Sequence, residues 1–499
     1  MKFINKGYLF HLTGIIIVAF WLVMMGLLIK KQEFNSAASE QISENEAGDI
    51  DSSQKEWKEI FLKDRKVGYS ISFIRPFKDG YFMQDEVFLR LNLMGLDKGI
   101  YTITQTNTDK DFIIKDFVFK MNSGVVSYNI SGKVEGDRLL VKAGTARDNN
   151  AREVMLSEPP VISAGMEHLF KTRKMQIGET FRAPFFDPST MIQGEAVFRI
   201  AAKESLKINR IEYSAFRIEA EMWNNPITLW VDESGAVLKE EGFMGLVMIR
   251  SSAANASIGI EGSDDYYEMA AVPVDRSLPP DLEKLTYLKL RLNYKDSKGP
   301  YTIPDKTERQ TLDNDIMMVR LEKIPYVLSG DANYNRDDSL ETYLKPEFNI
   351  ESDSDEMIAK ADAIVGDDKS PVLKAKRLLN WVFDNIDKKP VVSVPSALEV
   401  LETRVGDCNE HATLLTALLR ASGIPARLSV GLVYNRGRFY YHAWTEAYLG
   451  RWISMDATLN QMPVDVSHIC LVYGNLDKQI EIMGIIGRLE FEVLDFGYN

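Results

Sequence analysis

Along the first half of the chain, hydrophobic and polar residues alternate in short runs, which is the period of half-buried β-strands. The clearest runs are Tyr69–Phe73 and Val87–Leu93, and turn-forming residues separate such runs from one another. Helical patterns are scarce, with Pro160–Thr172 the best short candidate. The pattern predicts a large, strongly curved antiparallel sheet over residues 56–275. It shows no catalytic cluster, so we expect a binding or spacer module there.

The pattern changes after the proline pair at 279 and 280, which marks a linker. A smaller β segment follows, and then helices. One of them begins at Ser370-Pro371, a capped start with proline at the first helical position, and places apolar residues on a single face. Strand-like alternation returns over 478–499. We therefore expect five parts: a membrane anchor (1–32), a flexible stalk (33–55), a β-rich domain (56–275), a small β segment (276–349) and a catalytic domain (350–499).

The amino-terminal stretch Tyr8–Ile29 is almost entirely apolar and is flanked by lysines. It is long enough to cross a bilayer, which predicts a transmembrane helix. A cleaved signal peptide, cut near Ala38, is the alternative. The simplest expectation is a single-pass protein of the cell inner membrane whose body lies outside the cytoplasm, in the periplasm. The bacterial setting comes from the family resemblance described below.

Candidate chemistry is concentrated near residue 408, in the sequence Gly-Asp-Cys-Asn-Glu. Asp407 is a good helix N-cap, Glu410 completes an approximate capping box, and Gly423 stands where a glycine would end the helix. Cys408 then lies in the first turn, where the helix dipole favours a thiolate. A buried inert core cysteine is the alternative for Cys408.

A histidine and an aspartate follow on a predicted hairpin. If a three-residue loop ending at Gly450 joins the strands, Leu449 is the centre, and His442 and Asp456 lie opposite each other. The three residues would then form a nucleophile, its base and the orienter of that base. A core histidine and a turn-forming aspartate are the alternatives. Asp465, past the strand, is expected to tolerate replacement by asparagine.

Four motifs in this order resemble the transglutaminase-like cysteine-enzyme superfamily: Gly406-Asp407-Cys408-x-Glu410-x-Ala412, Gly423-Ile424-Pro425-Ala426-Arg427, His442-Ala443-Trp444-x-Glu446 and Asp456-x-Thr458. The resemblance covers about residues 350–475. It implies a papain-like core and the roles of nucleophile, base and orienter for Cys408, His442 and Asp456. Ala457 departs from the proline that many members have there. No residue is matched to the side chain that completes the oxyanion hole.

The fold class expected for the whole chain is therefore α+β: an N-terminal transmembrane helix, a large antiparallel β domain and a C-terminal papain-like, transglutaminase-like α+β catalytic domain. The triad implies attack on an amide carbonyl and a thioester intermediate. Hydrolysis by a peptidase or amidase is favoured over crosslinking, because water is abundant and crosslinking needs a dedicated amine site. A non-enzymatic, membrane-tethered binding scaffold is the competing class. The expected partners are envelope peptides or proteins and the membrane.

Charge and composition exclude some alternatives. The net charge of −13 argues against a nucleic-acid ligand. A Cys408–Cys470 disulfide is a minor alternative, because Cys470 lies in an apolar run where a buried inert thiol is expected. His468 is expected to be a surface or core residue. A loop at Asp331–Thr342 resembles a calcium loop but lacks its glycine and its final glutamate, so a solvated acidic loop is preferred. We expect no cofactor and no metal.

Overall fold

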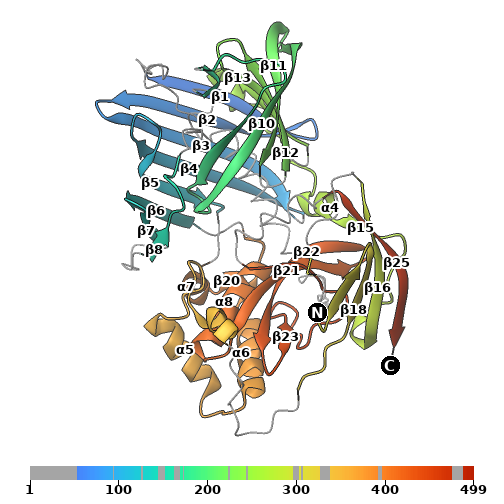
Figure 1. Cartoon of the computed structure of the whole chain (residues 1–499). Coiled ribbons are helices and arrows are strands. Elements are labelled where there is room, and N and C mark those ends of the chain that lie inside the picture. Colours follow the sequence, from blue (N-terminus) through green and yellow to red (C-terminus); the bar gives the residue numbers. More distant parts are fainter. Residues whose placement is uncertain are drawn as a thin grey trace, which may run out of the picture. The chain divides into compact units, whose positions relative to one another are not determined.

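The computed structural model describes residues 53–498 apart from 94, 125–126, 144–151, 162–168, 172, 223–224, 243–244, 296–302, 305–306, 326–337, 392–395 and 475–486. The chain forms two compact units that divide between Tyr266 and Tyr267 (Figure 1). The amino-terminal unit is a β-sheet structure, and the carboxy-terminal unit holds the candidate chemistry.

The amino-terminal unit is built on one 14-stranded antiparallel sheet. Its strands are β1 (Gln54–Leu62), β2 (Arg65–Phe77), β3 (Gly80–Leu93), β4 (Leu96–Thr108), β5 (Ile114–Asn122), β6 (Ser127–Glu135), β7 (Arg138–Ala143), β8 (Arg152–Met155), β9 (Thr180–Asp187), β10 (Ile192–Ile208), β11 (Ile211–Met222), β12 (Asn225–Asp232), β13 (Val237–Glu241) and β14 (Leu246–Ser251). Strands β1 to β8 are neighbours in sequence order, as are β9 to β14, and β1 pairs with β14 to join the two runs (Figure 1).

The alternation in the sequence sets which face of this sheet is buried. Along β3, Val87, Leu89, Leu91 and Leu93 are buried, while the residues between them are partly or fully exposed. Successive side chains of a strand point to opposite faces, so one apolar face is removed from water and the other is left polar. The large antiparallel sheet expected from the sequence is therefore present.

Three small sheets belong to the carboxy-terminal unit. One joins β16 (Leu285–Tyr294), β17 (Gln310–Asp313), β18 (Ile316–Arg320) and β25 (Leu489–Tyr498). A second joins β15 (Val272–Pro273), β21 (Ala426–Asn435), β22 (Arg438–Tyr448), β23 (Trp452–Met455) and β24 (Ile469–Tyr473). The third is a short parallel pair of β19 (Asp387–Lys388) and β20 (Val405–Gly406).

The longer helices of the described chain gather beside β21 and β22 (Figure 1). They are α5 (Asp355–Val365), α6 (Pro371–Asn385), α7 (Ala397–Thr403) and α8 (Cys408–Ala421), and α8 packs against the other three. Two short helices, α3 (Ala253–Ala256) and α4 (Tyr266–Ala270), precede them, and short 3-10 turns occur at Leu282–Lys284 and Asp338–Leu344. Ser370 caps α6 by accepting from the backbone N–H of Leu373, as its sequence predicts.

The α+β fold class expected for the chain is wrong. Strands make up 53% of the structure and helices only 18%, so the protein is mostly β. The expectation gave too much weight to the helical periodicity of one segment, while fourteen strands share a single sheet elsewhere. The anchor expected at Tyr8–Ile29, nearly all of the stalk and the start of the acidic loop lie outside the described residues. None of the helices that the structure describes is long and apolar enough to cross a bilayer.

Candidate active site

Cys408 is the first residue of helix α8, and the start of this helix is capped as the sequence predicts. A side-chain oxygen of Asp407 accepts from the backbone N–H of Asn409 at 3.2 Å, and Glu410 accepts from the backbone N–H of Asp407 at 2.8 Å. Gly423 has a φ of 76° just past the end of the helix, the left-handed conformation for which glycine is best suited. Cys408 is fully buried at the positive end of the helix dipole, where a thiolate is favoured.

Helix α8 packs directly on β22, the strand that carries His442. The hydroxyl of Thr445 donates to the carbonyl of Ala412 at 3.0 Å and lies 3.1 Å from the hydroxyl of Thr416. Both hydroxyls are buried, so these contacts fix the helix on the strand.

His442 and Asp456 form a buried hydrogen-bonded pair. Nε2 of His442 lies 2.6 Å from Oδ2 of Asp456, and the two side chains are 4% and 1% exposed. Burial alone would raise the pKa of Asp456, but the charges and hydrogen bonds of His442 and His468 hold that pKa well below its usual range. Asp456 is therefore ionised and can only accept, so Nε2 of His442 is the donor and Nδ1 is left available for a proton.

The hairpin register differs from the expectation by two residues. Tyr448 pairs with Trp452 and Thr445 with Met455, so the hairpin is centred on Gly450 and not on Leu449. In this register Asp456, one residue after β23, lies opposite Trp444. Its side chain therefore contacts His442 diagonally. A shift of two residues keeps every side chain on its own face, so the two residues still meet. The β21–β22 turn at Arg436-Gly437 agrees with the sequence, since both residues have positive φ.

Close strand packing also surrounds His442. Gly431 of β21 pairs with His442, and a Cβ placed at Gly431 would lie 1.9 Å from the carbonyl oxygen of Ile469 in β24. Only glycine therefore lets β24 approach β21 at this level. Strand β24 begins next to His468, so this approach brings the segment that contains His468 toward the pair.

His468, for which the sequence predicts a surface or core position, is buried and contacts the pair. Its Nε2 lies 3.2 Å from the same Oδ2 of Asp456, and its Nδ1 lies 3.3 Å from Oδ1 of Asp465. Asp465 is buried and also accepts from Ser467 and Gln461. The expectation that Asp465 tolerates replacement by asparagine therefore disagrees with its burial and its hydrogen bonds. The three-residue spacing of Asp465 and His468 was the available signal, but nothing local ties it to Asp456.

Arg309 fixes the segment that bears Asp465 and His468. Its guanidinium donates to three carbonyls of this segment, at 3.2 Å to Val464, 2.5 Å to Asp465 and 3.1 Å to His468. The neighbouring Gln310 exchanges two hydrogen bonds with the backbone of Cys470. Both residues stand more than 150 positions earlier in the chain, which is why sequence reasoning missed them.

A further histidine, His411, lies in the first turn of α8. Its Nδ1 is 2.6 Å from the carbonyl of Asp407. Burial lowers the pKa of His411 to about 4, although the hydrogen bond to Asp407 and the charge of Asp456 oppose this shift. At neutral pH the ring is uncharged, so it braces the turn that holds Cys408 without adding positive charge.

Cys470 does not share the setting of Cys408. Both cysteines are buried thiols, and no disulfide joins them. Burial, with the charge of Glu446 adding to it, raises the pKa of the Cys470 thiol well above its ordinary value. Cys470 packs against Trp444 and Val464, which makes it an inert core thiol as expected.

The described side chains include one cluster whose donor atoms are close enough to suggest a metal: His442, Asp456 and His468, all within 4.8 Å of one another. The 2.6 Å between His442 and Asp456 fits a hydrogen bond. Two ligands of a tetrahedral zinc ion would stand about 3.3 Å apart. The arrangement is therefore better described as a proton-sharing network than as a metal site.

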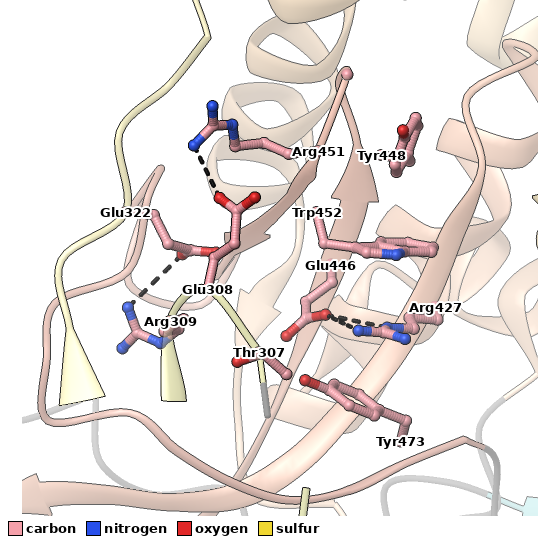
Figure 2. Close-up of a pocket in the computed structure, with 11 residues that line it drawn as sticks. Thr307, Glu308, Arg309, Glu322, Arg427, Glu446, Tyr448, Arg451, Trp452 and Tyr473 are labelled. Carbon is pink, nitrogen blue, oxygen red and sulfur yellow. Dashed lines mark hydrogen bonds and ion pairs between the residues drawn. The ribbon is translucent and has the colours of Figure 1, made fainter. Parts of the chain in front are cut away.

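The carboxy-terminal unit also has a cavity lined by charged and aromatic residues, among them Arg309 (Figure 2). Two nitrogens of the Arg427 guanidinium donate to the same oxygen of Glu446, Oε2, at 3.0 and 2.6 Å, and the guanidinium lies over the rings of Trp452 and Tyr473 (Figure 2). The two residues belong to two of the motifs that carried the family resemblance. Because Arg427 and Glu446 are paired, they link β21 to β22 and act as structural residues.

Residues 358–457 match the Transglutaminase-like superfamily. No curated protein matches the chain. Among solved structures, a candidate cysteine protease from Cytophaga hutchinsonii is 17% identical over 43% of this chain and 85% of its own, with a TM-score of 0.26. The periplasmic domain of TgpA from Pseudomonas aeruginosa is 19% identical over 38% and 87%, with a TM-score of 0.24. A β-barrel-like protein of DUF1849 from Brucella abortus is 13% identical over 40% and 95%, with a TM-score of 0.32. At these TM-scores the structural likenesses carry no argument.

The chain thus contains a domain of the transglutaminase-like superfamily, within the unit that holds Cys408, His442 and Asp456. The resemblance seen in the four motifs is confirmed, and it supports a cysteine-enzyme family for this domain.

Proposed function

We propose that this protein is a cysteine enzyme that cleaves amide bonds with Cys408 as nucleophile, His442 as base and Asp456 as orienter. The buried 2.6 Å hydrogen bond between His442 and Asp456 carries this proposal, because it holds the ring through Nε2 and points Nδ1 of His442 away from the carboxylate. The capped start of α8 supports it by placing the thiol where a thiolate is favoured.

The reaction follows from these roles. His442 takes the thiol proton of Cys408 at Nδ1, and the thiolate attacks the amide carbonyl carbon. As the tetrahedral intermediate collapses, the C–N bond breaks and the leaving amine takes the proton from His442, which leaves a thioester. His442 then takes a proton from water, the resulting hydroxide displaces the thiolate, and the acid product and the thiol of Cys408 are formed. An amine in place of water would give a crosslinked amide.

The negative charge of Asp456 stabilises the imidazolium that forms twice in this cycle.

Hydrolysis is the preferred outcome, with envelope peptides or proteins as the substrate class. Location outside the cytoplasm and attachment to a membrane stay predictions that rest on the amino-terminal sequence alone. The competing proposal, a binding scaffold without activity, has no need of a buried, ionised aspartate aimed at a histidine.

A single assay separates these proposals. Fluorescein-labelled casein is incubated with the wild-type protein and with Cys408→Ala, with and without dansylcadaverine. Release of labelled peptides by the wild type alone supports a peptidase. Dansyl incorporation by the wild type alone supports acyl transfer.

Inactivity on casein would leave the substrate unidentified. Alkylation of the Cys408 thiol would still test the proposed chemistry, because it needs no substrate. If Cys408 reacts with iodoacetamide at pH 6 no faster than a free cysteine model compound, the proposed enzyme mechanism is wrong.

A further inference from the structure

Asp456 accepts from two imidazoles on one oxygen. Oδ2 lies 2.6 Å from Nε2 of His442 and 3.2 Å from Nε2 of His468. The other oxygen, Oδ1, accepts from the backbone N–H groups of Thr458 and Leu459 at 2.7 and 3.1 Å. With four donors around it, this carboxylate is held in one orientation.

The second imidazole stands between two carboxylates. Nδ1 of His468 lies 3.3 Å from Oδ1 of Asp465, on the opposite side of the ring from Asp456. Asp465 also accepts from the N–H and hydroxyl of Ser467 and from the side chain of Gln461. An ionised carboxylate only accepts, so both nitrogens of His468 must donate, and only an imidazolium has two N–H groups.

The charges around His468 agree with this state. Burial opposes a charged ring, but Asp465 and Asp456 together raise the pKa of His468 above its ordinary value. His468 is fully buried, Trp444 packs edge-on against its ring, and Arg309 binds its carbonyl. Other titratable groups of this region include His442, with its ring centroid 5.6 Å away, His411, which interacts electrostatically with Asp456, and Glu322, 3.6 Å from Arg309.

We propose that His468 is a permanent imidazolium clamped between Asp456 and Asp465, and that it is a positioning residue which sets how strongly Asp456 stabilises charge on His442. This inference rests on the proposed function and adds a part to it. The negative charge of Asp465 offsets the positive charge of His468. When His442 is also protonated, the charges of the two carboxylates, Asp456 and Asp465, balance those of the two imidazoliums. Because His468 carries its charge at all times, it opposes the second positive charge on His442 and limits how high in pH that charge persists.

The first test is the pH profile of the His468→Gln variant. Glutamine can still donate a hydrogen bond to Asp456 but carries no charge. The high-pH limit of the reaction, where His442 loses its proton, is expected to move upward by about one pH unit, because two buried charges at this separation interact strongly. Asp313→Asn, at an exposed turn of the same unit, is the matched control and should leave the profile unchanged.

The readout is the rate of Cys408 alkylation by iodoacetamide from pH 4 to 10, together with the ring signals of His442 in protein labelled with ¹⁵N-histidine. An unshifted His442 titration in a folded His468→Gln variant overturns the inference while leaving the proposed function intact. Ordinary thiol behaviour of Cys408 in the wild type is the separate result that defeats the proposed function.

A second measurement uses the wild type and does not depend on the folding of a variant. In the ¹⁵N spectrum at pH 7.5, His468 is expected to show two protonated ring nitrogens. A signal from an unprotonated nitrogen of His468 at that pH would mean a neutral ring, and the proposal would then be wrong.

Discussion

His442 and Asp456 meet diagonally, not as direct partners across the hairpin. The pairing of Thr445 with Met455 sets Asp456 opposite Trp444, and His442 lies two residues before Trp444 in β22. Their hydrogen bond is nevertheless 2.6 Å long and buried. Asp456 stands one residue beyond β23, where the chain turns and the backbone N–H groups of Thr458 and Leu459 reach its other oxygen. The carboxylate is therefore fixed from both sides.

Replacing Asp456 with asparagine should cost about four orders of magnitude in turnover, the effect of the equivalent change in a serine-protease triad. The amide lacks the charge that stabilises the imidazolium, and it can hold His442 in the wrong tautomer. Turnover of a labelled protein substrate measures the loss. Asp313→Asn, an exposed carboxylate in the same unit, is the control and should keep full activity. Wild-type turnover by the Asp456→Asn variant would remove Asp456 from the mechanism.

The two cysteines should differ sharply in reactivity. At pH 6 iodoacetamide should label Cys408 much faster than Cys470, because burial raises the pKa of the Cys470 thiol, whereas Cys408 stands at the positive end of the α8 dipole. Peptide mapping by mass spectrometry measures both rates in one sample. In urea the two rates should converge, since the difference depends on the fold. Equal labelling of the folded protein would contradict the assignment of Cys408 as nucleophile.

Replacing Arg309 with methionine should lower the free energy of unfolding by about 3 kcal/mol or more, because three buried carbonyls would lose a charged donor. Urea denaturation measures this change. Arg451→Met is the matched control. Arg451 is 46% exposed and pairs with the exposed Glu308, so its loss should cost less than about 1 kcal/mol. Similar costs for the two variants would mean that Arg309 does not stabilise this segment.

In the amino-terminal unit, Glu240 should make stability depend on pH. It is fully buried in β13, and burial raises the pKa of its carboxyl to about 8, with Lys58 opposing the shift. The folded state therefore holds a proton that the unfolded state releases near pH 4.5. This contribution to stability is complete below about pH 4.5 and is lost as the pH rises to about 8.

The variant Glu240→Gln should remove that dependence. Urea midpoints of the wild type should fall across this pH range, while those of the variant should fall less. The variant should be the more stable of the two at pH 8. Parallel pH curves would show that Glu240 is ionised in the folded protein.

The sequence was most informative where a signal is local. Asp407, Glu410 and Gly423 predict the start and end of α8, and the alternation in strands such as β3 predicts the large sheet. The hairpin that holds His442 and Asp456 was also foreseeable, because moving its centre from Leu449 to Gly450 shifts the pairing register by two residues. A register shift of one residue would have placed the two side chains on opposite faces.

What the sequence could not supply were contacts between distant segments. His468 reaches Asp456 only because β24 packs closely against β21 at Gly431, and Arg309 reaches the same segment from far earlier in the chain. Neither the hydrophobic periodicity of a segment nor the spacing of its motifs indicates such contacts. The predicted α+β fold class was wrong for a related reason. The fraction of residues in strands depends on how many short strands join one sheet.

The pairing of β1 with β14 has a mechanical consequence. Trp57 pairs with Ser251 and Leu62 with Leu246, so the chain enters β1 and leaves β14 at the same end of this pair. Tension applied between Gln54 and Ser251 would load the hydrogen bonds of the pair one after another instead of all at once. The sheet would then peel open at its centre under a small force, while the hairpins on either side kept their own bonds.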